Sequence, residues 1–170
     1  PILHRQPPAH PGMSIAEVDT PSLLLDLDAF ERNLRQLPAS LPSNRTRVRP
    51  HAKSHKCPQI ALRQISAGAA GICCQKVSEA EAMAEGGVRD IHVANEIVGE
   101  SKLAALAQLA RDVRISVCAD DAHNVERLEA AAARADVSLS VFVELDLGTQ
   151  RCGVTPGEPL LTLARKIAAS

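Results

Sequence analysis

Aromatic residues are almost absent from this sequence of 170 residues, which contains two Phe and no Tyr or Trp. Its core must therefore be built from aliphatic side chains, because hydrophobic residues still make up 45% of the chain. This composition, together with 23% charged residues, is typical of a soluble globular protein and excludes a disordered one. We expect Ala-rich helices packed on strands of Val and Ile.

An excess of charge of one sign is also missing, since 19 basic and 20 acidic side chains give a net charge of −1. This balance excludes a nucleic-acid binder that depends on a concentrated basic patch. No apolar run approaches 18 residues, so no membrane span is predicted. The first residues do not show the basic and apolar segments of a signal peptide. We therefore expect a cytoplasmic protein without nucleic-acid or membrane partners.

Paired cysteines are a third absence. The five cysteines are odd in number and form no C-x-x-C pair; they are Cys57, Cys73, Cys74, Cys118 and Cys152. Cys73 and Cys74 are adjacent and would point to opposite sides of a strand, which makes them poor zinc ligands together. A reduced, cytoplasmic protein without a structural disulfide is the plain interpretation.

Two periodicities alternate along the chain after an irregular, proline-containing extension at 1–18. Apolar runs of strand length are predicted at 22–27, 46–50, 70–74, 90–94, 114–118 and 139–145. Helical patterns lie between them at about 28–37, 57–66, 78–86, 100–110 and 121–135, with another near Pro159. Such alternation favours a parallel sheet covered by helices.

The spacing of the strands adds a fold prediction. From residue 46 the strand starts are about 20 to 25 residues apart, which is typical of a (β/α) barrel. A barrel needs eight strands, whereas five are counted from residue 46. Either the sheet is a complete, open, doubly wound sheet, or the chain is part of a longer barrel protein. The composition does not distinguish between these two alternatives.

Helix ends are also predicted. Ser78 with Glu81 three residues later has the spacing of a capping box. Asp120 and Asp121 precede the Ala-rich helix that contains Leu128 as candidate caps. Gly86 and Gly87 follow the helix of residues 78–86 and predict its C-terminal end.

The densest polar cluster is RPHAKSHK, residues 49–56, directly after a predicted strand. In α/β folds the C-terminal ends of strands carry active sites. Strand alternation would place Arg49, His51 and Lys53 on one face, and a desolvated lysine beside cations can become a nucleophile. The alternative is a solvated basic loop. His51 and His55 are weak metal-ligand candidates, because no carboxylate is near them in sequence.

A second polar cluster, ELDLGTQRCG at 144–153, ends the last predicted strand. Arg151 either binds an anion or lies over a ring, or it pairs with Glu144 or Asp146. Gln75 ends the strand of residues 70–74 and is either a hydrogen-bonding site residue or an ordinary polar residue at a strand end. Asn95 and Glu96 are weaker candidates after the next strand.

These segments resemble a known family, the fold-type III pyridoxal-phosphate enzymes with the alanine racemase fold. DTPSLLLDLD at 19–28 with Asn33 is similar to their first strand and helix. RPHAKSHK at 49–56 is similar to the cofactor-lysine segment of the D-threonine aldolase and D-serine dehydratase branch. GICCQKVSEAE at 71–81 and the segment 144–153 resemble D-threonine and 3-hydroxy-D-aspartate aldolases, and Pro11-Gly12-Met13 resembles the extension of the latter.

The resemblance implies a role for each candidate site residue. Lys53 would bind pyridoxal 5'-phosphate as a Schiff base and be the catalytic residue. Gln75 and Arg151 would neighbour the cofactor, with Arg151 near the pyridine side of the ring, and His51 would line the same site. No residue here is assigned as a metal ligand.

The resemblance also implies a domain organisation. After the extension at 1–18, residues 19–45 would form the first strand, which belongs to a second β-domain, and the first helix. Residues 46–170 would form the first five βα units of the alanine racemase type barrel. Family members continue with three more strands, Gly-rich phosphate-binding loops and a C-terminal β-domain that carries a His-x-Asp or His-x-Cys metal pair.

We therefore expect a pyridoxal-phosphate lyase that cleaves D-threonine or 3-hydroxy-D-aspartate by a retro-aldol reaction to glycine and an aldehyde. The divalent metal would come only through the missing portion, so these 170 residues alone should be inactive, and the full-length protein should be a homodimer. The alternatives are a D-serine dehydratase-type β-elimination, a non-catalytic pyridoxal-phosphate carrier and an inactive fragment.

Overall fold

The computed structural model describes residues 7–41 and 46–170. Its contacts divide the chain into two compact units, Pro1–Ala39 and Ser40–Ser170. The first unit contains the 3-10 helix η1 (Ile15–Glu17) and the helix α1 (Leu27–Ser40), which extends one residue past the division. The second unit contains the sheet and the remaining helices.

The strand predicted at 22–27 is wrong. Residues 22–26 adopt no regular structure, and α1 begins at Leu27. The side chain of Asp26 accepts a hydrogen bond of 2.9 Å from the Ala29 N–H, so Asp26 starts a helix where we expected a strand to continue. In the part of the chain that the structure describes, no strand pairs with this segment, and an extended segment needs such a partner for its backbone groups.

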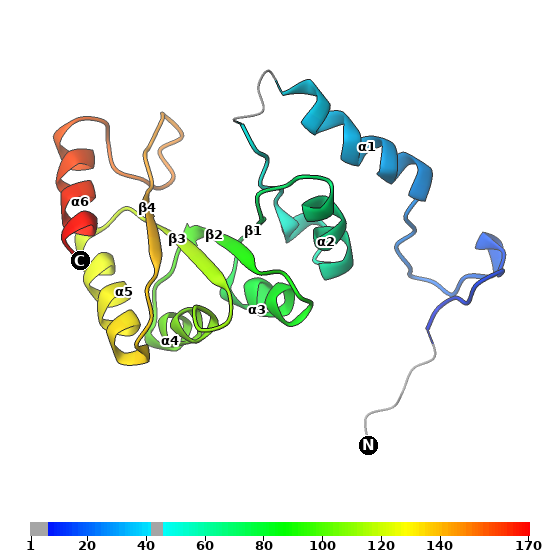
Figure 1. Cartoon of the computed structure of the whole chain (residues 1–170), viewed down its shortest axis with the longest axis horizontal. Helices are drawn as coiled ribbons and strands as arrows, with labels where there is room; N and C mark the ends of the chain where they lie inside the picture. Colours follow the sequence, from blue (N-terminus) through cyan, green and yellow to red (C-terminus); the bar gives the residue numbers. More distant parts are fainter. Residues whose placement is uncertain (1–6, 42–45) are drawn as a thin grey trace. The chain divides into compact units, whose positions relative to one another are not determined.

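The second unit alternates strands with helices (Figure 1). Its elements are η2 (Ala52–Ser54), α2 (Pro58–Ser66), β1 (Ile72–Cys74), α3 (Val77–Glu85), β2 (Asp90–Glu96), α4 (Glu100–Leu109), β3 (Arg114–Ala119), α5 (Ala122–Ala135), β4 (Ser140–Val143) and α6 (Glu158–Ala169). The predicted helices and four of the predicted strands are therefore present, with ends shifted by a few residues.

The sheet is parallel throughout and has the order β1-β2-β3-β4. In Figure 1 the helices α3, α4 and α5 follow one another along one side of the sheet, in the same order as the strands. A doubly wound sheet reverses its strand order at a switch point, and this sheet does not. The order is that of consecutive βα units of a barrel, which decides between the two sheets left open by the sequence.

The strand predicted at 46–50 is also wrong as a regular strand. The segment is extended beside β1, and its carbonyls of Val48 and Pro50 accept hydrogen bonds from Ala70 and Cys73 at 2.8 and 2.7 Å. Pro50 has no N–H to donate, so the ladder does not continue. Only an isolated bridge between His51 and Cys73 follows.

An ion pair holds this segment to the start of β2. Arg49 Nη1 lies 2.7 Å from Asp90 Oδ1, and Arg114 joins the same carboxylate at 3.3 Å. The guanidinium passes over Gly71, where a Cβ atom would lie 2.2 Å from Arg49 Nη1 and 2.6 Å from the Asp90 carbonyl oxygen. Only glycine leaves room for this crossing.

The register of the strands separates an apolar face from a polar face. Ile72, Ile91 and Ile115 are aligned across three strands and are buried against the helices. Because successive side chains of a strand alternate, the next aligned row, Cys73, His92 and Ser116, points to the other face. The helices complete the apolar core with buried leucines, which are Leu103, Leu106, Leu128 and Leu163.

Two predicted helix ends are confirmed. The Asp121 carboxylate accepts a hydrogen bond of 2.8 Å from the Asn124 N–H and caps α5. Gly86 is the C-cap of α3, and Gly87 follows with a φ of +100°, a left-handed conformation that favours glycine.

The capping box predicted at Ser78 and Glu81 is wrong. Helix α3 begins at Val77, and its N-cap Lys76 makes no side-chain cap. The carboxylate of Glu79 instead accepts the N–H of Gln75 at 2.8 Å. The helix starts earlier than the pattern suggested because this glutamate reaches back to the residue after β1.

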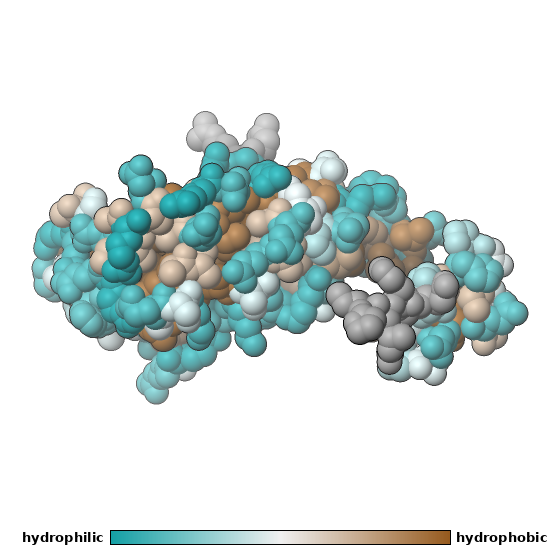
Figure 2. Space-filling model, turned by 90° about the horizontal axis from the view of Figure 1, so that it is seen from below, coloured by the Kyte–Doolittle hydropathy of each residue, from teal (hydrophilic) through white to brown (hydrophobic). Residues whose placement is uncertain are grey.

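The surface of the described residues is mixed in character. On the face in Figure 2, hydrophilic residues lie around and between apolar ones. Within residues 7–41 and 46–170, no helix combines the length and the apolar character that a membrane crossing requires.

We expect Asp121→Ala to lower the free energy of unfolding by about 1 kcal/mol, because it removes the side-chain cap of α5. Urea denaturation followed by circular dichroism measures this change. Asp112→Ala, at an exposed position after α4, is the matched control and should leave the midpoint unchanged. Equal midpoints for both variants would show that the cap contributes nothing.

Candidate active site

The polar face of the sheet has His92 at its centre. His92 Nδ1 lies 2.9 Å from Ser116 Oγ, and Nε2 lies 3.6 Å from Cys118 Sγ. The ring meets Phe142 edge-on at a centroid distance of 5.2 Å. Burial, followed by the positive charge of Arg49, lowers the pKa of His92. The imidazole is therefore neutral near pH 7 and acts as a hydrogen-bonding group.

Lys53 lies in the short helix η2 and is exposed. The predicted strand alternation does not extend to Lys53, because the chain leaves the extended conformation after His51. The ring of His51 caps η2, with Nδ1 accepting the Lys53 N–H at 3.3 Å. Lys53 is thus presented from a turn at the C-terminal end of the segment beside β1.

His51 is half-buried next to this turn. Burial lowers its pKa most, the charge of Lys53 lowers it further, and Gln75 and Glu79 act in the opposite direction. Its Nε2 atom is enclosed and makes no well-aligned hydrogen bond among the described residues, although the Gln75 side chain interacts with the ring. The result is a neutral imidazole beside the Gln75 amide.

Gln75 directly follows β1 and is half-buried. Its N–H donates to Glu79 and its carbonyl oxygen accepts from Asn95 Nδ2 at 3.2 Å, so its backbone is fixed on both sides. The bridge between His51 and Cys73 brings Lys53, His51 and Gln75 to the same end of β1. We call these three residues the lysine group.

Arg151 lies on the loop after β4. The Asp146 carboxylate stabilises this loop by accepting hydrogen bonds from the N–H groups of Gly148 and Gln150, at 2.9 and 3.1 Å. The Arg151 side chain is 82% exposed, and its Nη2 is 4.0 Å from Glu144 Oε1. The structure therefore joins Arg151 to Glu144, as the second of the two sequence interpretations had it. Among the described residues, Arg151 makes no hydrogen bond or ion pair with the lysine group.

Sequence reasoning missed a cluster of three side chains from separate segments. Potential metal-ligand atoms of Glu96, Glu144 and Cys152 all lie within 4.8 Å of one another. A register shift between Val93 and Glu96 brings Glu96 opposite Cys118. The local sequence carries no signal for this irregularity, which lies beside Glu96. We call Glu96, Glu144 and Cys152 the carboxyl group cluster.

The pKa values of the two glutamates in the carboxyl group cluster are shifted in opposite directions. Burial, opposed by its own backbone and supported by the neighbouring Glu144, raises the pKa of Glu96. The hydrogen bond from Cys152 Sγ, 2.8 Å from Oε1, lowers the pKa of Glu144. Burial and Glu144 also raise the pKa of Cys118 to about 12. Of the two carboxyl groups, Glu96 therefore keeps its proton to a higher pH than Glu144.

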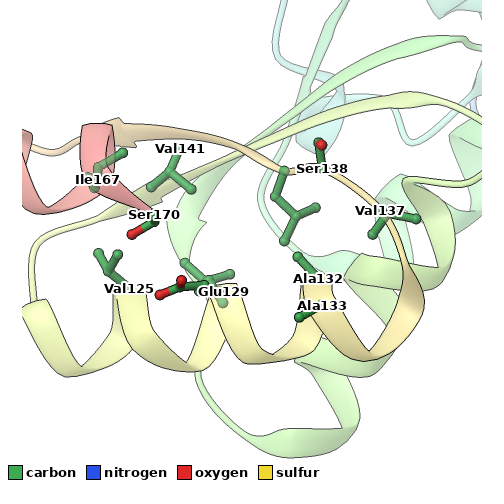
Figure 3. A pocket seen from close by; sticks show the side chains of 11 residues that line it. Val125, Glu129, Ala132, Ala133, Val137, Ser138, Val141, Ile167 and Ser170 are labelled. Atoms are coloured by element: carbon green, nitrogen blue, oxygen red, sulfur yellow. The ribbon is translucent and has the colours of Figure 1, made fainter.

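Several cavities lie among the described residues. One of about 440 Å³ is at the C-terminal ends of β1 and β2 and is lined in part by Gln75, Asn95 and Glu96. Another of about 310 Å³ lies between α5, β4 and α6 (Figure 3), and mostly apolar side chains such as Val125 and Val141 line it. The second cavity is on the helix side of β4 and does not contain any predicted site residue.

Comparison with known proteins adds the family. The family described as alanine racemase, N-terminal domain, matches residues 25–170. The chain belongs to this family. The predicted fold, an α/β barrel of the alanine racemase type represented by its first βα units, is thereby confirmed. An alanine racemase of Clostridium difficile shares this fold at 13% identity, with a TM-score of 0.73 over 83% of this chain and 37% of the other.

More similar members of the alanine racemase family are aldolases. The chain is 53% identical to a D-threonine aldolase of Arthrobacter sp over 94% of its length and 42% of the relative. It is 44% identical to a 3-hydroxy-D-aspartate aldolase of Paracoccus denitrificans, over 96% of the chain and 43% of the relative.

A solved structure of a D-threonine aldolase also resembles this chain closely. The D-threonine aldolase of Filomicrobium marinum is 49% identical and superimposes with a TM-score of 0.94, covering 98% of this chain and 45% of that one. The chain thus spans less than half the length of the relatives that it matches.

We expect Glu96→Gln to stabilise the protein more at pH 7 than at pH 4. The folded state binds the Glu96 proton more tightly than the unfolded state, so the wild type loses stability as the pH rises above the ordinary value of 4.5. An amide can still donate to Glu144 but does not titrate. Thermal denaturation at several pH values measures the difference, and Glu129→Gln, exposed on α5, is the control. A difference that is constant with pH would contradict the raised pKa of Glu96.

Proposed function

We propose that this chain is the cofactor-lysine part of a pyridoxal-phosphate lyase that cleaves D-β-hydroxy-α-amino acids by a retro-aldol reaction. The products are glycine and an aldehyde. One observation carries the proposal: the exposed amine of Lys53 stands on a fixed turn at the C-terminal end of the β1 region. The relatives named D-threonine aldolase and 3-hydroxy-D-aspartate aldolase support it at 53% and 44% identity.

The lysine group fits the cofactor. An amine reacts covalently with an aldehyde only when it is accessible, and Lys53 is exposed. The His51 ring and the Gln75 amide beside it can meet polar atoms of a bound molecule. When bound, pyridoxal phosphate supplies an electron sink for the cleavage of a bond to Cα.

Each further residue has a role that follows from its surroundings. His51 stays neutral and offers a ring face and one nitrogen to the ligand. Gln75 offers an amide from a backbone that is held on both sides. Arg151 stays cationic and, since its side chain is exposed, is able to turn toward the pyridine side of the cofactor.

The identity of the reaction rests on the relatives. A D-threo-3-hydroxyaspartate dehydratase of Delftia sp. HT23 is only 28% identical, with a TM-score of 0.79 over 89% of this chain and 40% of that one. β-Elimination is therefore the second candidate. We further propose small D-amino acids as substrates, a divalent metal bound outside these residues, a homodimer and a cytoplasmic location for the intact protein.

We expect Lys53 to carry the cofactor. Incubating the chain with pyridoxal phosphate, reducing with borohydride and mapping peptides should place the pyridoxyl mass on Lys53. Lys53→Ala should lose this label, whereas Lys102→Ala, at an exposed position on α4, should retain it. Labelling of Lys56 or Lys76 in place of Lys53 would refute the assignment.

We expect no turnover of D-threonine by the 170-residue chain alone, with or without added divalent metal, because it covers 42% of the D-threonine aldolase it resembles. A longer protein that contains this chain should release glycine and acetaldehyde from D-threonine, and Lys53→Ala should abolish the release. Ammonia and a keto acid as products would favour elimination. Lysine-dependent turnover by the chain alone would show that the site requires less than proposed.

A further inference from the structure

The segment GICCQKVSEAE contains a buried carboxylate, Glu79, to which the proposed function gives no role. Glu79 lies in the first turn of α3, and its side chain is only 10% exposed. A carboxylate in such a place loses its hydration and needs partners for both oxygens. Glu79 has them, since Oε1 pairs with Lys56 Nζ and Oε2 accepts the Gln75 N–H at 2.8 Å.

These two partners belong to the two segments of the lysine group. Lys56 ends the turn that carries Lys53, and Gln75 is the residue that follows β1. The N–H of Lys56 donates to the Ala52 carbonyl oxygen at 2.7 Å and closes the turn around Lys53. One carboxylate therefore ties the lysine-bearing turn to the end of the neighbouring strand.

The turn that carries Lys53 includes an unfavourable backbone conformation at Lys56. Lys56 has a φ of +50°, a left-handed conformation that a side chain with a Cβ atom rarely adopts. Such a residue persists where surrounding contacts hold it. The ion pair with Glu79 is the side-chain contact that holds Lys56.

The charge of Glu79 is maintained by these same contacts. Burial by itself would raise the pKa of Glu79, but the hydrogen bonds from Lys56 and from the Gln75 and Lys76 N–H groups outweigh it, so the pKa lies below its ordinary value. The negative charge is also felt at His51, where it opposes the effect of Lys53 and Lys56.

We propose that Glu79 is a positioning residue for the candidate cofactor lysine: its carboxylate fixes the turn that carries Lys53 against Gln75. This inference rests on the proposed function for the role of Lys53. The clamp itself, formed by Glu79 with Lys56 and the Gln75 N–H, is independent of which reaction the intact protein catalyses.

The test compares Glu79→Gln with Glu85→Gln, the same change at an exposed position on the same helix. In Glu79→Gln, amide exchange at Gln75 should accelerate about tenfold, as expected for the loss of one charge-assisted hydrogen bond. The NMR titration midpoint of His51 should fall, because a negative charge near it is gone. The ratio of pyridoxyl label on Lys53 to that on Lys56 should also fall about tenfold, since Lys56 is released.

Glu79→Asp keeps the negative charge. The NMR titration midpoint of His51 should therefore return toward the wild-type value in this variant, whereas a purely structural effect of Glu79 would leave the midpoint unrestored. If circular dichroism shows that Glu79→Gln does not fold, Lys56→Gln replaces it, because the Lys56 side chain is 61% exposed. Lys56→Gln removes the same ion pair. The pyridoxyl label on Lys53, measured relative to that on Lys102, should therefore fall by the same factor.

Wild-type values for Gln75 exchange, the His51 midpoint and the labelling ratio in a folded Glu79→Gln variant would overturn the inference. A wild-type chain that takes no label on Lys53 would instead contradict the proposed function. In that case, Gln75 exchange and the His51 titration still decide whether Glu79 holds the turn.

Discussion

The register between parallel strands is the constraint on which the rest of this structure depends. It aligns Ile72, Ile91 and Ile115 on the helix side, where burial of each such side chain contributes about 1.5–3 kcal/mol. The alternate positions then have to face the other way. A shift by one residue would exchange the two faces and expose the apolar core, so the polar face is as strongly specified as the core itself.

The two groups of side chains at the C-terminal ends of the strands show the same electrostatic behaviour with opposite signs. Near the lysine group, burial and neighbouring cations keep His51 neutral. In the carboxyl group cluster, burial and a neighbouring carboxylate raise the pKa of Glu96. In both groups, burial and a neighbouring charge of the same sign shift a side chain toward its neutral form, which is less costly to enclose than its charged form.

Relatives at different levels of sequence identity bear differently on the fold and on the proposed function. At 13% identity an alanine racemase still shares the fold, because a parallel sheet needs only the apolar pattern and the turns. At 53% identity the D-threonine aldolase is far more similar to this chain. The proposed reaction consequently rests on that similarity and on the exposed Lys53, because the fold alone would support several reactions.

The sequence by itself determined the order and type of most elements, since their periodicity, the Asp121 cap and the Gly86–Gly87 end are local features. It also identified Lys53, His51, Gln75 and Arg151 as candidates, although their roles remain proposals. Tertiary structure alone decided that residues 22–27 and 46–50 form no regular strand, because strands depend on partners. It alone brought Glu79 to Lys56 and Glu96 to Glu144, because contacts between distant segments depend on register and irregularities that no local pattern encodes.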